Sequence, residues 1–316
     1  MKAVVVTGFA AQPELVDLPV PEPGPGEFLV RLHAAGMNPF DWKVADGALR
    51  DSVPYAFPMI MGSDGAGVVE RTGPGVTRFR PGDHVYGQFM RLPQGVGSYA
   101  EYTLAQQDGK VAHIPEALSF TLAAALPTAS VTAYQAVEAA LLDHSRILLI
   151  NGASGGVGQS AIQFAARTGA RVLATGTPDV AAHLRDLGAH TVVDFTRSPV
   201  HEQVAAAFPG GVDAVLDLVT PAGGDIGPMA RLLHPGGTLI STNYATDPVA
   251  LASRDILGVN LANDPTVETL THLADLAVAG DLRVRIDAEV PLADVPAALA
   301  RARVGKATGK TVITLA

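Results

Sequence analysis

At residues 151–158 the chain reads Asn151-Gly152-Ala153-Ser154-Gly155-Gly156-Val157-Gly158, between an apolar run (146–151) and a helix-like run (159–168). A glycine-rich turn between a strand and a helix is the setting in which free amides at a helix N-terminus bind phosphate groups. Gly155 lets the backbone approach a pyrophosphate, and Gly158 lets the helix pack closely on the strand. We therefore predict that the turn binds a dinucleotide, with Ala153 in place of the usual first glycine. The residues predicted to bind it are Ala153, Ser154, Gly155, Gly156, Val157 and Gly158; the alternative is a turn without a ligand.

On the C-terminal side of this turn, apolar strand-like runs alternate with short helix-like runs. Strands are predicted at residues 171–175, 191–194, 214–219 and 238–242, and helices at 180–187, 200–208 and 226–233. This alternation is typical of βαβ units in a doubly wound parallel sheet, the Rossmann arrangement. The pattern supplies the strand and helix context that a dinucleotide-binding turn requires.

The two ends of the chain have a different pattern. Up to about residue 118, strand-like pieces at 2–7, 27–34, 66–71 and 84–87 are separated by Gly- and Pro-rich turns, which is typical of a β-rich, barrel-like domain. Near the C-terminus, helices are predicted at 267–279 and 295–303, and strands at 284–290 and 311–315. The last strand indicates that the tail returns to the first domain. We predict an α/β fold with a Rossmann domain at 119–284 and a β-rich domain made of 1–118 and 285–316.

Length and composition limit the possible functions. The chain has 316 residues, enough for two domains. Its net charge of −9 does not favour binding to nucleic acid. It has no cysteine, which excludes disulfides and thiolate metal sites. No apolar run approaches the roughly 20 residues of a membrane span, and the N-terminus does not resemble a secretory signal, so we expect a cytoplasmic protein with no membrane partner.

The preferred coenzyme depends on the end of the second strand, residues 171–175. An acidic residue there would bind the ribose 2′-hydroxyl and favour NAD. Gly176 stands at that position instead, so no carboxylate repels a 2′-phosphate, and Thr175 or Thr177 offers a hydroxyl donor. This favours NADPH over NADH. Arg185 and Arg197 are candidates for the phosphate, or are ordinary surface charges.

Several other stretches occur in the order found in the medium-chain dehydrogenase/reductase superfamily, and the sequence resembles its quinone oxidoreductase branch over essentially the whole chain. The stretches are Ala35–Lys43, Gly62–Val69, Phe79–Gly87, Ala125–Ala129 and Gly305–Val312, beside the glycine turn. The resemblance implies a GroES-like domain formed by both chain ends, a Rossmann domain between them, and an active site in the cleft between the two domains. It also implies a homodimer, often formed through an edge of the Rossmann sheet. Residues 255–260 are the candidate edge strand, or alternatively an internal strand.

The departures from the family pattern concern its zinc sites. Zinc-dependent members carry a cysteine where this chain has Asn38, and Gly-His-Glu where it has Gly62-Ser63-Asp64. Their structural zinc needs four cysteines, and this chain has none. His33, His84 and His113 are predicted to be packing or surface residues. The resemblance therefore implies an enzyme without zinc, in which no Lewis acid activates an alcohol.

A quinone accepts hydride more readily than a simple carbonyl, because the charge is delocalised onto an oxygen that a hydrogen bond stabilises. We therefore predict a zinc-independent, NADPH-dependent reductase that transfers hydride to a small quinone. One alternative is reduction of the carbon–carbon double bond of an enone or enoyl compound. Others are a non-catalytic NADPH-binding protein, or a metal-dependent alcohol dehydrogenase with His and Asp ligands.

Two residues are catalytic candidates by this resemblance. Asn38 matches an asparagine beside the nicotinamide, where it orients the ribose or donates to the acceptor oxygen; before Pro39 it is alternatively a helix N-cap. Lys43 is a candidate for a hydrogen bond to the ribose or to an enolate, or is a solvated charge. Trp42 lines the acceptor pocket or fills the core. Asp64 accepts a hydrogen bond near the lost zinc position or stabilises its own turn.

Coenzyme contacts are also predicted outside the glycine turn, at Thr128, Thr132, Asn243 and Lys306. Thr132 alternatively bonds within its own helix. Asn243 follows strand 238–242, at the strand end where open α/β sheets bind ligands. Tyr244 beside it shapes the acceptor pocket or covers the sheet edge. Lys306 and Lys310 belong to a loop that resembles a segment returning to the coenzyme, or are surface charges.

Overall fold

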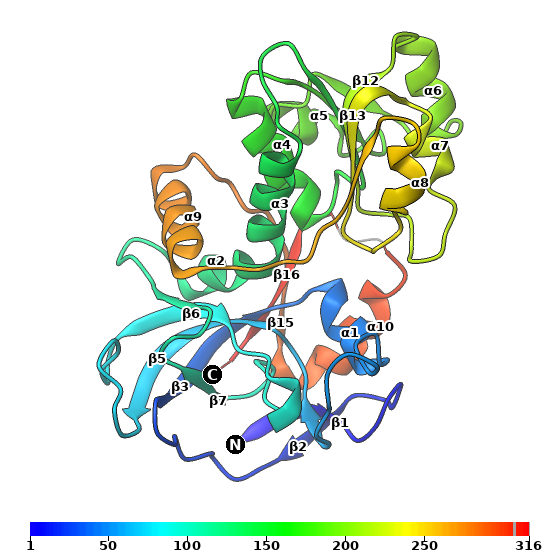
Figure 1. The fold of residues 1–316 in the computed structure, drawn as a ribbon. Coiled ribbons are helices and arrows are strands. Elements are labelled where there is room, and N and C mark those ends of the chain that lie inside the picture. Colours follow the sequence, from blue (N-terminus) through cyan, green and yellow to red (C-terminus); the bar gives the residue numbers. More distant parts are fainter. Residues whose placement is uncertain (306–307, 316) are drawn as a thin grey trace. The chain divides into compact units, whose positions relative to one another are not determined.

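The computed structural model describes residues 1–305 and 308–315, which form two compact units (Figure 1). Unit 1 comprises Met1–Ala129 and Pro265–Ala316, and unit 2 comprises Ser130–Asp264. Unit 2 contains a parallel sheet with helices, and unit 1 contains two largely antiparallel sheets. The predicted fold class, an α/β Rossmann domain plus a β-rich domain, is confirmed.

Unit 2 is built on a parallel sheet with the strand order β11-β10-β9-β12-β13-β14. This is the order of a dinucleotide-binding Rossmann sheet, in which the strand order reverses between β9 and β12. The strands are β9 (Ile147–Asn151), β10 (Arg171–Thr175), β11 (Thr191–Val193), β12 (Val212–Asp217), β13 (Leu233–Ser241) and β14 (Leu257–Asn260). The helices are α3 (Pro127–Ala139), which begins in unit 1, α4 (Gly156–Arg167), α5 (Ala181–Asp186), α6 (Val200–Ala207), α7 (Gly227–Ala230) and α8 (Pro248–Ala252). Among the described strands, β14 is an outer strand of the sheet, as the edge-strand prediction required.

Helix α4 starts directly after the glycine turn and is buried over most of its length. Ala161, Ile162 and Ala165 recur at the spacing of one helix face and belong to the core. Two glutamines of α4, Gln159 and Gln163, are also buried, and each has a polar partner. The amide of Gln159 donates to the Ser154 carbonyl at 2.7 Å, and that of Gln163 donates to the Gln159 carbonyl at 3.1 Å. These bonds satisfy buried polar groups and hold the helix against the turn.

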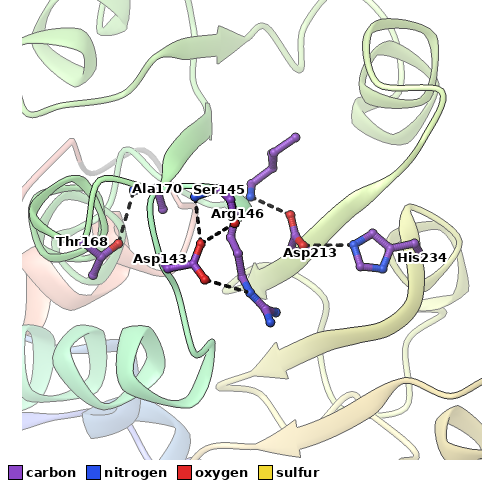
Figure 2. Close-up of polar contacts among 8 residues, drawn as sticks. Asp143, Ser145, Arg146, Thr168, Ala170, Asp213 and His234 are labelled. Carbon is purple, nitrogen blue, oxygen red and sulfur yellow. Dashed lines mark hydrogen bonds and ion pairs between the residues drawn. The ribbon is translucent and has the colours of Figure 1, made fainter.

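The amino ends of β9, β12 and β13 carry a separate polar cluster (Figure 2). Asp213 accepts a hydrogen bond from the backbone N–H of Ile147 at 2.8 Å and forms another with Nε2 of His234 at 3.1 Å. Nδ1 of His234 is hydrogen-bonded to the Pro235 carbonyl at 2.8 Å. Only a doubly protonated imidazolium donates to both acceptors, and the Pro235 carbonyl and the Asp213 carboxylate raise the pKa of His234. This cluster lies at the opposite strand ends from the glycine turn.

The larger sheet of unit 1 has the order β15-β16-β3-β5-β6-β8, and β7 also pairs with β3. Its strands are β3 (Glu27–Gly36), β5 (Asp64–Thr72), β6 (His84–Gln88), β7 (Tyr102–Gln106), β8 (Val111–His113), β15 (Ile286–Pro291) and β16 (Lys310–Thr314). The smaller sheet contains β1 (Lys2–Val6), β2 (Glu14–Asp17) and β4 (Met59–Ile60). The α-helices are α1 (Pro39–Ala45), α2 (Phe120–Ala125), α9 (Val267–Ala279) and α10 (Val295–Ala302).

The C-terminal segment completes unit 1. Strand β16 lies beside β3 (Figure 1). The two strands are antiparallel, with Val312 opposite Gly36. Side chains from both segments share one core, including Phe28 and Leu32 of β3 and Ile313 of β16. The predicted return of the tail to the first domain is therefore confirmed.

The chain passes from one compact unit to the other at 129/130 and at 264/265. We predicted the domain boundaries at 118/119 and 284/285. Helix α2 packs against β3 and β5, and α9 packs against β8, so residues 119–129 and 265–284 belong to unit 1. The Tyr86 hydroxyl of β6 also donates to the Leu270 carbonyl of α9. Hydrophobic periodicity predicts each helix but not the sheet on which it packs. Within the described part of the chain, no helix is long and apolar enough to cross a membrane.

Candidate functional site

The glycine turn of unit 2 is open on one side and tightly packed on the other. Gly155 is the N-cap of α4, and a Cβ placed there would lie 3.7 Å from its nearest described neighbour, the Gly152 carbonyl oxygen. A Cβ on Gly158 would lie 2.5 Å from the Cα of Ala153, so only glycine allows this close approach. The first N–H groups of a helix have no acceptor within the helix, and here they border the open side at Gly155. This geometry fits the pyrophosphate of a dinucleotide.

Polar side chains lie beneath the turn, at the carboxyl ends of three adjacent strands. The N–H of Gly152 donates to Oγ1 of Thr175 at 2.8 Å, and Thr175 Oγ1 lies 3.5 Å from Oδ1 of Asn151. The Asn151 amide donates to Asp217 at 2.8 Å. Asp217 is fully buried, and its Oδ2 has no partner among the described residues. Because Thr175 is buried and bonded to the turn, our hypothesis that it donates to a 2′-phosphate is wrong.

Gly176 and Thr177, which we predicted from the sequence to lie at the coenzyme ribose, directly follow β10. Gly176 is buried, and a Cβ there would lie 2.7 Å from a Leu184 methyl group. Thr177 is half-buried and follows directly. Asp179, which we did not weigh from the sequence, is an exposed carboxylate in the loop before α5. Arg185 is exposed on α5, and Arg197 is also exposed.

The remaining candidates of unit 2 follow β13 or lie on α3. The Asn243 amide donates to the Leu218 carbonyl at 3.2 Å, so Asn243 links the segments that follow β13 and β12. Tyr244 is 57% exposed and has a positive φ of 58°, which is uncommon for a residue with a large side chain. Thr132 is buried, and its hydroxyl accepts a hydrogen bond from the Asn263 amide at 3.1 Å.

Asn38 lies in unit 1 and is the N-cap of α1, with Pro39 at the first helical position, which confirms the capping alternative. Its amide nitrogen donates to Asp64 at 2.9 Å and to the Gly36 carbonyl at 3.3 Å. Its Oδ1 accepts a hydrogen bond from Nζ of Lys310 at 2.5 Å. A cation on one side and a carboxylate on the other determine the orientation of the amide. Both amide hydrogens of Asn38 are therefore used inside the protein.

Asp41, which sequence reasoning missed, is fully buried on α1. Its carboxylate accepts hydrogen bonds from the Asn38 N–H at 2.7 Å, the Ser63 N–H at 3.0 Å and the Tyr99 hydroxyl at 2.6 Å. Burial raises the pKa of Asp41 to about 7, although the bond from Tyr99 opposes this shift. The sequence signal was an acid three residues after an N-cap, where it accepts the N-cap amide.

Asp64 joins Asn38 to the start of α3. Its carboxylate accepts the Thr128 N–H at 2.9 Å and the Thr128 hydroxyl at 2.6 Å, and the Gln88 amide donates to that hydroxyl at 2.9 Å. Burial raises the pKa of Asp64, although the charge of Lys310 opposes this shift. Three predicted residues, the buried Asn38 and Asp64 and the half-buried Thr128, therefore form one hydrogen-bonded network.

Lys310 is 4% exposed and donates to the Met37 carbonyl at 3.0 Å as well as to Asn38, so the surface-charge alternative is wrong for this residue. It stands two positions before the buried Val312 of β16, and alternate residues of a strand share a face. That spacing was the signal for its burial.

The other candidates of unit 1 are less involved in this network. Lys43 is exposed on α1, and desolvation by its neighbours lowers its pKa. Trp42 packs against the core of unit 1, in agreement with the prediction that it fills the core. Lys306 lies outside the described residues. His33 and His84 contact the ring of Phe120, with ring centroids 4.5 and 4.9 Å apart, as predicted for packing residues.

Comparison with known proteins assigns the family. Residues 24–116 match the family model described as the alcohol dehydrogenase GroES-like domain, and residues 187–313 match the one described as zinc-binding dehydrogenase. A chloroplastic quinone oxidoreductase of Triphysaria versicolor is 33% identical, over 99% of this chain and 98% of that protein. The chain belongs to the medium-chain dehydrogenase/reductase family.

Medium-chain dehydrogenases are oxidoreductases that use a nicotinamide coenzyme. Another relative, the 2-methylene-furan-3-one reductase of Solanum lycopersicum, is 31% identical over 93% of this chain and 73% of that protein. The structure of the quinone oxidoreductase from Coxiella burnetii superimposes with a TM-score of 0.87 at 29% identity, over 100% of this chain and 99% of that chain. The resemblance to the quinone oxidoreductase branch of the medium-chain family is therefore confirmed.

The residues at the family's catalytic zinc position do not fit a zinc ion. Asn38 offers only its Oδ1, which already accepts a hydrogen bond from Lys310, and Ser63 replaces a histidine. Both oxygens of Asp64 accept hydrogen bonds from Asn38 and Thr128. Within residues 1–305 and 308–315, no group of three or more His, Cys, Asp or Glu side chains is placed to hold a metal ion.

Proposed function

We propose that the protein is a zinc-independent, NADPH-dependent oxidoreductase that transfers hydride to a quinone. The observation that carries this proposal is the glycine turn, which is open at Gly155 and closely packed at Gly158. The matched families and the quinone oxidoreductase relatives support the class of reaction. The hydrogen bonds that occupy Asn38 and Asp64 support chemistry without zinc.

NADPH is the proposed coenzyme because Gly176 leaves no carboxylate at the position that would bind a ribose 2′-hydroxyl. Thr177 follows it and offers a hydroxyl donor to a 2′-phosphate. The residues proposed to bind the rest of the coenzyme are Thr128, Thr132, Ala153–Gly158, Asn243 and Lys306. A homodimer and a cytoplasmic location remain predictions of the sequence.

The bound coenzyme supplies a hydride, which carries two electrons to the quinone. With NADPH oxidised to NADP⁺ by that transfer, one proton from water would complete the hydroquinone. Lys43 is proposed to stabilise the oxygen on which negative charge develops, because an exposed ammonium is a strong hydrogen-bond donor to an oxyanion. Asn38 is proposed to act as a positioning residue, since its amide hydrogens already bind Asp64 and the Gly36 carbonyl.

The test measures the loss of reduced-coenzyme absorbance with NADPH and with NADH, against a panel of small quinones and enones, in the presence of a chelator. NADPH-dependent turnover of quinones that survives the chelator is the expected result. Turnover that the chelator abolishes and zinc restores would instead show a metal-dependent enzyme. Tight coenzyme binding without turnover would show a binding protein.

A second candidate function is reduction of the carbon–carbon double bond of an enone. The observation that favours it is the similarity to the 2-methylene-furan-3-one reductase of Solanum lycopersicum. Both acceptors take hydride into a conjugated system, so the same residues serve either reaction. The ratio of kcat/KM for enones and quinones in the panel distinguishes the two functions.

A further inference from the structure

The peptide group that opens the glycine turn is held from both sides. Its N–H, on Gly152, donates to Oγ1 of Thr175 at the end of β10. Its carbonyl, on Asn151, accepts the N–H of Leu218 at 3.0 Å, directly after β12. Gly152 has a φ of +92°, and glycine adopts a positive φ about as readily as a negative one. The two neighbouring strands therefore determine how this peptide group is oriented.

The side chains beneath the turn form a chain of hydrogen bonds that runs in one direction. The Thr175 hydroxyl accepts from Gly152, so its own hydrogen is free to point at Oδ1 of Asn151. The Asn151 amide then donates to Oδ1 of Asp217, which accepts this hydrogen bond. All three side chains are buried, where hydrogen bonds are stronger and polarise one another.

The chain of bonds lies where the sheet binds ligands. Thr175, Asn151 and Asp217 each end a strand, and the three strands β10, β9 and β12 are neighbours. The strand order reverses between β9 and β12, and open α/β sheets bind ligands outside the carboxyl ends of strands at such a point. Asp217 also accepts the N–H groups of Val219 and Thr220 at 3.1 and 3.4 Å, which ties the segment after β12 to the same network.

We propose that Thr175, Asn151 and Asp217 are positioning residues for the coenzyme, which they do not touch: they hold the Gly152 peptide group and so set the shape of the phosphate-binding turn. This proposal rests on the proposed function in one respect, that the turn binds a nicotinamide dinucleotide. Thr175 is the residue to change, because, of the three side chains, its hydroxyl accepts the hydrogen bond from the Gly152 N–H.

The test compares Thr175→Val, which removes the hydroxyl at nearly constant shape, with Thr175→Ser, which keeps it. The dissociation constant of NADPH is measured by fluorescence titration without an acceptor, and the Tm of each coenzyme-free variant is measured alongside. We expect Thr175→Val to raise the Kd about tenfold, the effect of one lost hydrogen bond, and Thr175→Ser to stay within about twofold of the wild type. In steady-state turnover, the KM for NADPH rises in Thr175→Val while kcat changes little.

Equal Kd values for Thr175→Val and the wild type would overturn the proposal. Equal losses in the Val and Ser variants would also overturn it, because Ser keeps the hydroxyl that the proposal requires. A purely structural role would lower the Tm of Thr175→Val and leave the Kd of the folded protein unchanged. The wild-type titration separates the two proposals. If the wild type binds neither NADPH nor NADH, the proposed function itself is wrong and the positioning role fails with it.

Discussion

Replacing Gly155 by alanine separates coenzyme binding from folding. In the coenzyme-free protein the added methyl group has room, because its nearest described neighbour is 3.7 Å away. Gly155 has φ −77° and ψ 170°, which alanine adopts without strain. The methyl group instead occupies the open side of the turn, where a phosphate would approach the backbone amides. Gly155→Ala therefore acts on the bound state and not on the fold.

The magnitudes follow from this geometry. Alanine at an N-cap is less favourable than glycine by about 0.5–1 kcal/mol. Alanine also reduces the conformational entropy of the unfolded chain, which stabilises the protein by about 0.4–1 kcal/mol. The two effects nearly cancel, so the free energy of unfolding changes little. Loss of one charge-assisted hydrogen bond to phosphate costs about 1.5–3 kcal/mol, which raises the Kd of NADPH roughly 10- to 100-fold.

Gly158→Ala provides the contrast, because its Cβ would lie 2.5 Å from the Cα of Ala153 and the backbone has to move. Such overpacking costs about 1–3 kcal/mol and lowers the Tm of the coenzyme-free protein by several degrees. Gly210→Ala is the control for the substitution itself, because its Cβ has no described neighbour within 4 Å. The assay combines thermal unfolding of each coenzyme-free variant with titration of NADPH. If Gly155→Ala binds NADPH as tightly as the wild type, the turn does not bind the coenzyme as we infer.

Three further substitutions test other parts of the structure. His234→Gln lowers the Tm at pH 6 more than at pH 9. The pKa of His234 is raised in the folded protein, so its contribution to stability is complete below the pKa of the unfolded chain, about 6.5. That contribution is lost as the pH rises through the pKa of the folded protein. Because the side chain is 37% exposed, we expect a difference of only a degree or two by thermal unfolding, and a shift that does not depend on pH would contradict the imidazolium assignment. Thr177→Asp introduces a carboxylate at the proposed ribose site. We expect the ratio of kcat/KM for NADPH to that for NADH to shift about tenfold or more towards NADH. An unchanged ratio in steady-state kinetics would place coenzyme selection elsewhere. Lys310→Met costs about 3–5 kcal/mol, because it leaves Asp64 buried without its cation and raises the pKa of that carboxyl further. Since the folded state then binds the proton more tightly than the unfolded chain, the stability of Lys310→Met falls as the pH rises, and denaturant unfolding at pH 6 and 8 should show that adding Asp64→Asn restores part of it.

Local patterns in the sequence predicted the Rossmann domain well, because its signals lie close together in the chain. The strand, the glycine turn and helix α4 occupy about twenty consecutive residues, and the following strands repeat the same alternation. Capping also acts over a few residues, so the N-cap position of Asn38 followed from Pro39 alone. The phosphate-binding role that we propose for the turn rests on the same kind of signal, because the orientation of backbone amides at a helix start is a local property.

The buried networks depend on contacts between distant parts of the chain, which no local pattern encodes. Lys310 meets Asn38 across 272 residues, and this contact exists only because β16 pairs with β3. Thr175 reaches Gly152 because β10 and β9 are neighbours in the sheet. A lone lysine or threonine in a sequence is compatible with solvent exposure, and only the partners that strand pairing brings to it make burial favourable. The sequence therefore indicated the family and the fold class of the chain, while the folded arrangement decided which polar side chains are buried.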